Sequence, residues 1–152
     1  MTRHREIDIN ATTTASPEVV FSLLRDGATW PTWSPIDSFA LERAGDREPE
    51  GVGAIRVFRR GRVTGRDEIV EIVPSRRFAY ASRSGLPVRD YIGTIDVAPI
   101  ATGASIRWRA TFRPKIPGTG GLLERGIRRF LAGCAQGLAE YAAAVGAETR
   151  RS

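Results

Sequence analysis

Few side chains in this sequence could carry out chemistry by themselves. The chain has one histidine, His4, and one cysteine, Cys134. A Ser–His–Asp triad, a Cys–His pair and a histidine or cysteine metal site each need more than these two residues. His4 lies near a chain end, and Cys134 falls in an apolar helical stripe, where a buried small hydrophobe is expected. We therefore predict no metal and no cofactor, and we assign no catalytic residue.

Two tyrosines and a few strand carboxylates are the remaining candidates. Tyr80 and Tyr91 fall in apolar strand patterns, and a tyrosine in an apolar pocket keeps a hydroxyl that needs a partner, such as a ligand carbonyl. Asp67, Glu68 and Asp96 also lie within predicted strands. An unpaired inward carboxylate is costly and has a raised pKa, so we favour outward ion pairs with arginines of neighbouring strands. The alternation of residues around Asp67 leaves its direction open.

The composition indicates one soluble globular domain, residues 1–152, with a core of about 6–145. Of the 152 residues, 41% are apolar and 26% charged, which is ordinary for this class. There is no apolar run of about 18 residues for a membrane span and no signal-peptide core. The net charge is +6, but the arginines are scattered along strands, which argues against a nucleic-acid partner. We expect a cytoplasmic protein that is a monomer or a homodimer.

The elements that must position these side chains start with a long C-terminal helix, from about Gly120 to Val145. Apolar residues recur there at steps of three and four, which predicts one stripe of a helix. The stripe consists of Leu123, Ile127, Phe130, Cys134, Leu138, Tyr141 and Val145. Three glycines, Gly126, Gly133 and Gly137, cost helix stability and indicate either close strand approach or space for a ligand.

Most of the preceding chain alternates between apolar and polar residues, as strands do. The predicted strands are 5–14, 38–43, 54–59, 63–73, 77–84, 88–98 and 105–113. Imperfect alternation near Val70 predicts either a bulge in the fourth of them or a segment that is covered on both sides. Ser16 and Pro17 predict the start of a short helix, and a second short helix should carry Trp30 and Trp33. Strands in meander before one helix predict an α+β fold in which a curved antiparallel sheet wraps that helix.

A curled sheet against a rod leaves a cavity, which is a common place for a small-molecule site. The pocket-lining candidates come from the inward strand faces, the tryptophan corner and the helix stripe. They are Trp30, Trp33, Val57, Phe78, Tyr80, Tyr91, Gly93, Ile95, Trp108, Ala110, Phe112, Leu123, Ile127 and Phe130. The inward face at Arg56 and Val57 is left open. Each aromatic residue taken alone is better explained by core packing than by a pocket, and the group on one concave surface is the stronger evidence.

Four segments of the sequence resemble the SRPBCC superfamily of START-like, helix-grip proteins, in its polyketide cyclase/dehydrase-like branch. They are TTTASPEVVFSLLRDGATWPTWSP from Thr12, EIVEIVP followed by RRFAY from Glu68, YIGTIDVAP from Tyr91 and SIRWRATF from Ser105. The resemblance implies seven antiparallel strands gripping the C-terminal helix, with a deep apolar pocket between them. It implies ligand binding as the default role, which is an argument by analogy.

Three hypotheses for the function follow. The first is binding of a hydrophobic or aromatic small molecule, lipid-like or polyketide-like. The second is an aromatase/cyclase or dehydratase that uses the same pocket, in which a tyrosine or an inward arginine steers the chemistry and proximity supplies much of the rate. The third is a structural or regulatory partner protein. Convergence of two or more polar groups in the cavity would favour the second over the first.

Overall fold

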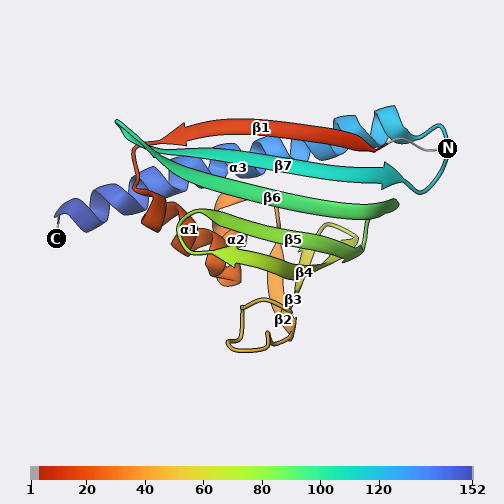
Figure 1. Cartoon of the computed structure of the whole chain (residues 1–152), viewed down its shortest axis with the longest axis horizontal. Coiled ribbons are helices and arrows are strands. Elements are labelled where there is room, and N and C mark those ends of the chain that lie inside the picture. The colour runs from red at the N-terminus through yellow and green to blue at the C-terminus, as the bar shows by residue number, and fades with distance from the viewer. Residues whose placement is uncertain (1–3, 152) are drawn as a thin grey trace.

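The computed structural model describes residues 4–151, in which one long helix lies along a seven-stranded antiparallel sheet (Figure 1). The strands are β1 (Arg5–Thr13), β2 (Ser38–Arg43), β3 (Ile55–Arg60), β4 (Val63–Val73), β5 (Arg77–Ser84), β6 (Val88–Ile100) and β7 (Gly103–Pro114). The helices are α1 (Pro17–Arg25), a 3₁₀ turn η1 (Gly27–Thr29), α2 (Trp30–Trp33) and α3 (Gly120–Arg151). The predicted α+β helix-grip fold is confirmed.

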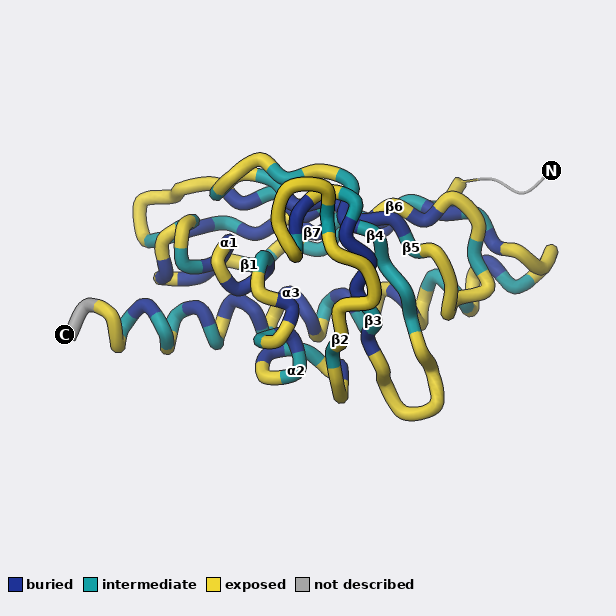
Figure 2. Tube along the Cα trace, turned by 90° about the horizontal axis from the view of Figure 1, so that it is seen from below, coloured by how far each residue is buried: buried dark blue, intermediate teal, exposed yellow. Residues whose placement is uncertain are grey.

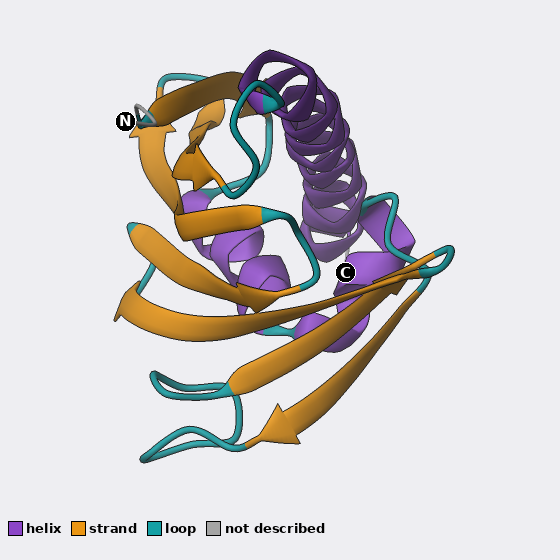
Figure 3. Ribbon diagram, turned by 90° about the vertical axis from the view of Figure 1, so that its right-hand side faces the viewer, coloured by secondary structure: helices purple, strands orange, loops and turns teal. Residues whose placement is uncertain are grey.

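The sheet runs in the order β1-β7-β6-β5-β4-β3-β2, and every neighbouring pair is antiparallel. Seen from the side, it curls around α3 and encloses the short helices (Figure 3). The register of β4 against β5 shifts between Ile69 and Glu71, which confirms the predicted bulge. A bulge increases local twist and so helps a strand to bend.

The termini of α1 follow from its sequence. The Ser16 hydroxyl accepts a hydrogen bond from the Val19 N–H at 3.3 Å, and Pro17 occupies the first helical position. Both are the expected N-terminal signals. Val20 and Leu24 are fully buried on the side that faces the sheet and α3.

Buried and exposed residues lie on opposite sides of the other elements too. The inner faces of β6 and β7 and one side of α3 are buried, while β2 and the turns are exposed (Figure 2).

Charged residues on the outer face of the sheet form cross-strand pairs. Arg107 pairs with Asp8 at 2.7 Å, and Asp96 lies between Arg77 and Arg109, each at 2.7 Å. These pairs agree with the predicted outward face of β7. The Asp96 carboxyl is partly desolvated, which opposes ionisation, but the two arginines hold its pKa below the usual range. Exposed pairs of this kind contribute little to stability individually.

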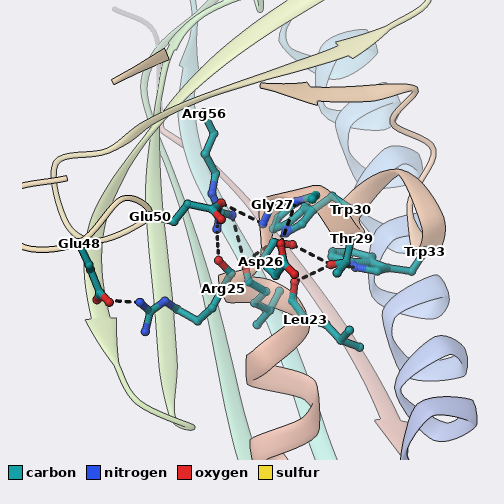
Figure 4. A network of polar contacts seen from close by, with 12 residues as sticks. Leu23, Arg25, Asp26, Gly27, Thr29, Trp30, Trp33, Glu48, Glu50 and Arg56 are labelled. Atoms are coloured by element: carbon teal, nitrogen blue, oxygen red, sulfur yellow. Dashed lines mark hydrogen bonds and ion pairs between the residues drawn. The ribbon is translucent and has the colours of Figure 1, made fainter. Parts of the chain in front are cut away.

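The helical corner of α1, η1 and α2 is held by one buried guanidinium, that of Arg56 on β3 (Figure 4). Its Nη1 donates to the Leu24 carbonyl at 3.0 Å, and its Nη2 donates to the Arg25 carbonyl at 2.7 Å. The Glu50 carboxylate pairs with the same Nη2 at 2.9 Å and also accepts from the Gly27 N–H at 2.9 Å. Arg56 thus caps carbonyls at the C-terminus of α1, where the helix itself supplies no partners.

Two of the three helix glycines have opposite roles. A Cβ at Gly137 would overlap the carbonyl oxygen of Trp33, so glycine is required where α2 meets α3. A Cβ at Gly126 would meet nothing within 4 Å. The close approach and the free space that the sequence indicated are therefore both present, at different glycines.

We predict that Gly137→Ala lowers the free energy of unfolding by about 1–3 kcal/mol, because α2 and α3 must move apart. Gly126→Ala is the matched control on the same helix and should raise it by up to about 1 kcal/mol through helix propensity. Urea denaturation followed by circular dichroism measures both. Equal effects of the two substitutions would contradict the assigned close contact.

Candidate functional site

A cavity of about 540 Å³ lies between the inner face of the sheet and the first half of α3. Its interior walls are mostly aromatic and aliphatic, from the helical corner, β3, β5, β6, β7 and α3. They include Trp30, Ile36, Phe58, Tyr80, Tyr91, Trp108, Leu123, Ile127 and Phe130. The volume is within the usual range for small-molecule sites, whereas protein cores normally hold few voids larger than a water molecule.

The mouth of the cavity is marked by apolar side chains that are exposed. Val63 is 50% exposed, Leu86 38%, Ile116 57% and Leu122 77%, and all four line the cavity. They come from the start of β4, the turn between β5 and β6, the segment that leads into α3 and the first turn of α3 itself. The Arg60 guanidinium lies 5.0 Å from the ring centroid of Phe130 at the same side. A ligand could therefore enter here without unfolding the sheet.

Tryptophan and phenylalanine rings pack together at the closed end of the cavity. Trp30 stacks on Phe58 with centroids 4.9 Å apart and meets Trp108 edge-on at 5.7 Å. Its Nε1 donates to the Leu24 carbonyl at 3.2 Å, so its polar atom is satisfied inside the protein. Trp33 packs against both tryptophans but does not line the cavity. One indole of the corner faces the cavity and the other belongs to the core.

Two tyrosine hydroxyls lie inside this apolar space. The Trp108 Nε1 donates to the Tyr80 hydroxyl at 3.1 Å, and because an indole N–H is only a donor, the Tyr80 oxygen must accept. Burial raises the pKa of both Tyr80 and Tyr91. The rings of Tyr80 and Tyr91 are neighbours, with centroids 6.2 Å apart, and both residues line the cavity.

Asp67 faces the cavity, which contradicts the outward ion pair that we favoured from the sequence. Val63, Gly65 and Asp67 all line the cavity, and Ile69 continues the same face into the core. The intervening Glu68 points outward and pairs with Arg83 at 2.9 Å. Burial raises the pKa of Asp67 to about 7, although the positive charge of Arg56 opposes the shift. The carboxyl is therefore close to half ionised at neutral pH.

The predicted pocket residues separate into two groups. Those that line the cavity are Trp30, Tyr80, Tyr91, Trp108, Leu123, Ile127 and Phe130. Those placed elsewhere are Trp33, Val57, Phe78, Gly93, Ile95, Ala110 and Phe112. Within the second group, Phe78 packs edge-on against Phe21 of α1 and Phe112 stacks on Tyr91, so both belong to the core.

Val57 and Gly93 lie outside the cavity lining, and each has a specific structural reason for its position. Val57 is on the outer face of β3, because Arg56 and Phe58 point inward and neighbours alternate along a strand. Gly93 pairs with Tyr80 across β5 and β6, and a Cβ there would overlap the tyrosine ring. The ring occupies the space that the missing side chain leaves. Gly93 thus shapes the site without reaching it.

Several cavity residues were missed from sequence. Phe58 would have followed from a correct choice of the inward face of β3. Asp67 and Ser82, which are cross-strand partners, both line the cavity, but bulges in this part of the sheet obscure the alternation that could have identified them. The exposed apolar residues at the mouth of the cavity could not be identified from the sequence, because a single apolar residue at the surface is ordinary.

No metal site and no membrane helix emerge from the structure. Within residues 4–149, no three His, Cys, Asp or Glu side chains are grouped closely enough to hold a metal ion. The described helices include none that is both long and apolar enough to cross a membrane. Cys134 is buried, and burial raises the pKa of its thiol to about 12, so the thiol stays protonated. It acts as a small hydrophobe, as predicted.

The fold is that of START-like, helix-grip proteins, and solved structures with this fold match nearly the whole chain. A START superfamily protein from Mycobacterium smegmatis is 14% identical, with a TM-score of 0.78, over 94% of this chain and 99% of its own. A major latex-like protein from Panax ginseng is 13% identical, with a TM-score of 0.72, over 91% and 97%. Norcoclaurine synthase from Thalictrum flavum is 17% identical, with a TM-score of 0.72, over 92% and 87%.

Residues 4–143 match the family described as polyketide cyclase / dehydrase and lipid transport, and the chain belongs to it. The family is the one that the sequence resemblance indicated. No curated protein matches the sequence. These three structural neighbours are under 25% identical, so they establish the fold and leave the ligand undetermined.

We predict that Asp67→Asn stabilises the protein at pH 8 by about 1–3 kcal/mol. The folded-state pKa of about 7 lies above the value of about 3.9 in the unfolded chain. Between these values the native state binds more protons, so wild-type stability falls as the pH rises from about 4 to 7 and then levels off. The asparagine variant escapes this loss. Urea denaturation from pH 4 to pH 8 measures the difference.

Glu68→Gln is the matched control, because it removes the same charge from the next residue, on the outer face. It should show no gain at pH 8. A wild type and an Asp67→Asn variant whose stabilities differ by the same amount at every pH would contradict the raised pKa.

Proposed function

We propose that this protein binds a hydrophobic or aromatic small molecule, lipid-like or polyketide-like, in the cavity between the sheet and α3. The observation that carries the proposal is the open cavity of about 540 Å³ with aromatic walls. An empty apolar space of this size exposes surface to water that a ligand would bury, at roughly 25 cal/mol for each Å². Exposed apolar residues at its mouth give such a ligand a continuous apolar route inward.

The comparisons with known proteins support the proposed class of ligand. The family description includes lipid transport. The solved norcoclaurine synthase holds dopamine and hydroxybenzaldehyde, two small aromatic molecules. We further propose a cytoplasmic protein, since the buried free thiol of Cys134 suits a reducing compartment. We also propose that it is a monomer or a homodimer.

Uptake of the neutral fluorescent probe Nile red tests the proposal. Purified, delipidated protein should bind it with enhanced fluorescence. Gly126→Phe should weaken this binding at least about tenfold, because Gly126 lines the cavity and has open space beside it. Gly121→Phe is the matched control, since Gly121 is on the same helix with open space but does not line the cavity.

An unchanged affinity in the Gly126→Phe variant would place the bound probe outside the cavity. Absence of any uptake by the wild type, together with native mass spectra that show no co-purified molecule, would contradict a binding function.

We propose as the second candidate a dehydratase or aromatase/cyclase that uses the same cavity. It is favoured by the convergence of Asp67, Ser82 and Tyr91 on one apolar space. A carboxyl with a pKa of about 7 is suited to general base catalysis at neutral pH. Asp67 would remove a proton next to a ligand carbonyl, and the Tyr91 hydroxyl would donate a hydrogen bond to the developing enolate oxygen.

Dehydration of an aryl β-hydroxyketone, followed by mass spectrometry, tests this second function. Asp67→Asn should lower the rate about 10²–10⁴-fold, as expected for loss of a general base. Tyr91→Phe should lower it by a smaller factor, and Glu68→Gln should leave it unchanged. A wild-type rate no higher than that of Asp67→Asn would contradict catalysis in this cavity.

A further inference from the structure

The Asp67 carboxyl lies in the cavity without a hydrogen-bonding partner of its own. Its cross-strand neighbours are Arg56 on β3 and Ser82 on β5. Its negative charge also helps to raise the pKa values of Tyr80 and Tyr91. The residues of α3 that line the opposite wall are apolar or glycine: Leu122, Leu123, Gly126, Ile127 and Phe130. Among the described residues, no side chain forms an ion pair or a hydrogen bond with the Asp67 carboxyl, and only the charge of Arg56 acts on it.

Arg56 is the cross-strand neighbour of Asp67, yet both of its Nη atoms are bound elsewhere. The two Nη atoms bind the Leu24 and Arg25 carbonyls and the Glu50 carboxylate. The Arg56 Nε is buried and has no partner within hydrogen-bonding distance. The guanidinium therefore points away from Asp67 toward the end of α1, and it acts on Asp67 only through its charge.

The charges of this interior do not balance. Arg56 and Glu50 form a neutral pair at 2.9 Å. An ionised Asp67 is then an additional negative charge in an apolar cavity, where an uncompensated charge is costly. A positively charged group of a ligand would remove that cost, and it is the complement that the protein itself does not supply.

We propose that Asp67 is the recognition residue for a basic nitrogen, and that the cavity selects hydrophobic amines over neutral or acidic molecules of the same shape. The inference rests on the proposed binding function and names its ligand class. The ammonium of the ligand would donate to the Asp67 carboxylate. Its apolar body would lie along Trp30, Leu123 and Phe130, which line the same cavity.

Two features favour an amine over an alcohol. An ammonium adds to its hydrogen bond a Coulomb attraction to the ionised carboxylate, which a neutral alcohol lacks. The aromatic rings around the cavity also attract cations through their faces. Arg59 and Arg60 line the cavity too, but both are exposed at the mouth, where solvent and salt screen their charge. They oppose the entry of a cation less than Asp67 favours its binding.

The proposal also determines how affinity depends on pH. The pKa of Asp67 is about 7, and an ammonium binds the ionised form. Tyr80 and Tyr91, which also face this carboxyl, have raised pKa values and stay neutral, and Arg56 stays charged. Amine affinity should therefore rise with pH up to about 7, by as much as tenfold for each unit, and level off above it.

The test uses three probes of one shape: 1-naphthylmethylamine, 1-naphthylmethanol and 1-naphthoic acid. Isothermal titration calorimetry measures each at pH 6, 7 and 8 with the wild type, Asp67→Asn and Glu68→Gln. At pH 8 the wild type should bind the amine at least tenfold tighter than the alcohol. Asp67→Asn should bind the two equally, and Glu68→Gln should match the wild type. Circular dichroism verifies that each variant is folded.

An alcohol or acid that binds as tightly as the amine would overturn the proposal, as would an amine preference that survives in Asp67→Asn. If none of the three probes binds but Nile red is taken up, the amine class is wrong and the binding function stands. If Nile red is not taken up either, the binding function itself fails.

Discussion

The interior of this protein depends on one buried guanidinium. Arg56 lies among Trp30, Phe39 and Phe78, with its centre 5.0–6.0 Å from their ring centroids. Burial lowers its pKa to about 10, and the Glu50 carboxylate opposes that shift, so it stays charged at neutral pH. A buried ion pair is weak evidence of net stability, but removing one partner is costly. Its value here is geometric, since it holds the C-terminus of α1 against β3 and so positions the tryptophan corner.

The helix-capping contacts of Arg56 also affect the candidate site in the cavity. The two Nη atoms of Arg56 bind the Leu24 and Arg25 carbonyls and the Glu50 carboxylate. The Asp67 carboxyl on the neighbouring strand lines the cavity, where it can meet a ligand. Of these two cross-strand neighbours, Arg56 on β3 holds the helical corner, and Asp67 on β4 lines the cavity. A fold-stabilising contact and a binding group are thus coupled through a single arginine.

The cavity exists because the two halves of the interior are filled differently. Toward the C-terminal half of α3, the short helices α1 and α2 pack between sheet and helix, and Gly137 permits contact with the backbone of α2. Toward the N-terminal half no such layer intervenes, and Gly126 leaves room. The curl of the sheet keeps the walls apart there. The same long helix is therefore a core element along one half and a cavity wall along the other.

The sequence by itself determined the elements and their order. The 3.6-residue stripe from Leu123 to Val145, the strand alternation and the caps at Ser16 and Pro17 are local patterns. They predicted α3, the meander and α1 closely, and the family resemblance predicted how they assemble. Local periodicity reports which side of an element is apolar, and that information is carried within a few residues.

The tertiary structure alone decided which apolar residues face the cavity and which face the core. Phe112 and Phe130 look alike in sequence, yet one is fully buried and the other lines the cavity. The bulges beside Asp67 obscured its direction, and Arg56 reads as a surface residue until its helix-capping contacts are known. Such assignments depend on what lies across the interior, which is set by residues far along the chain. Burial of a charge is decided by its partners, and here those partners come from α1 and the loop before β3.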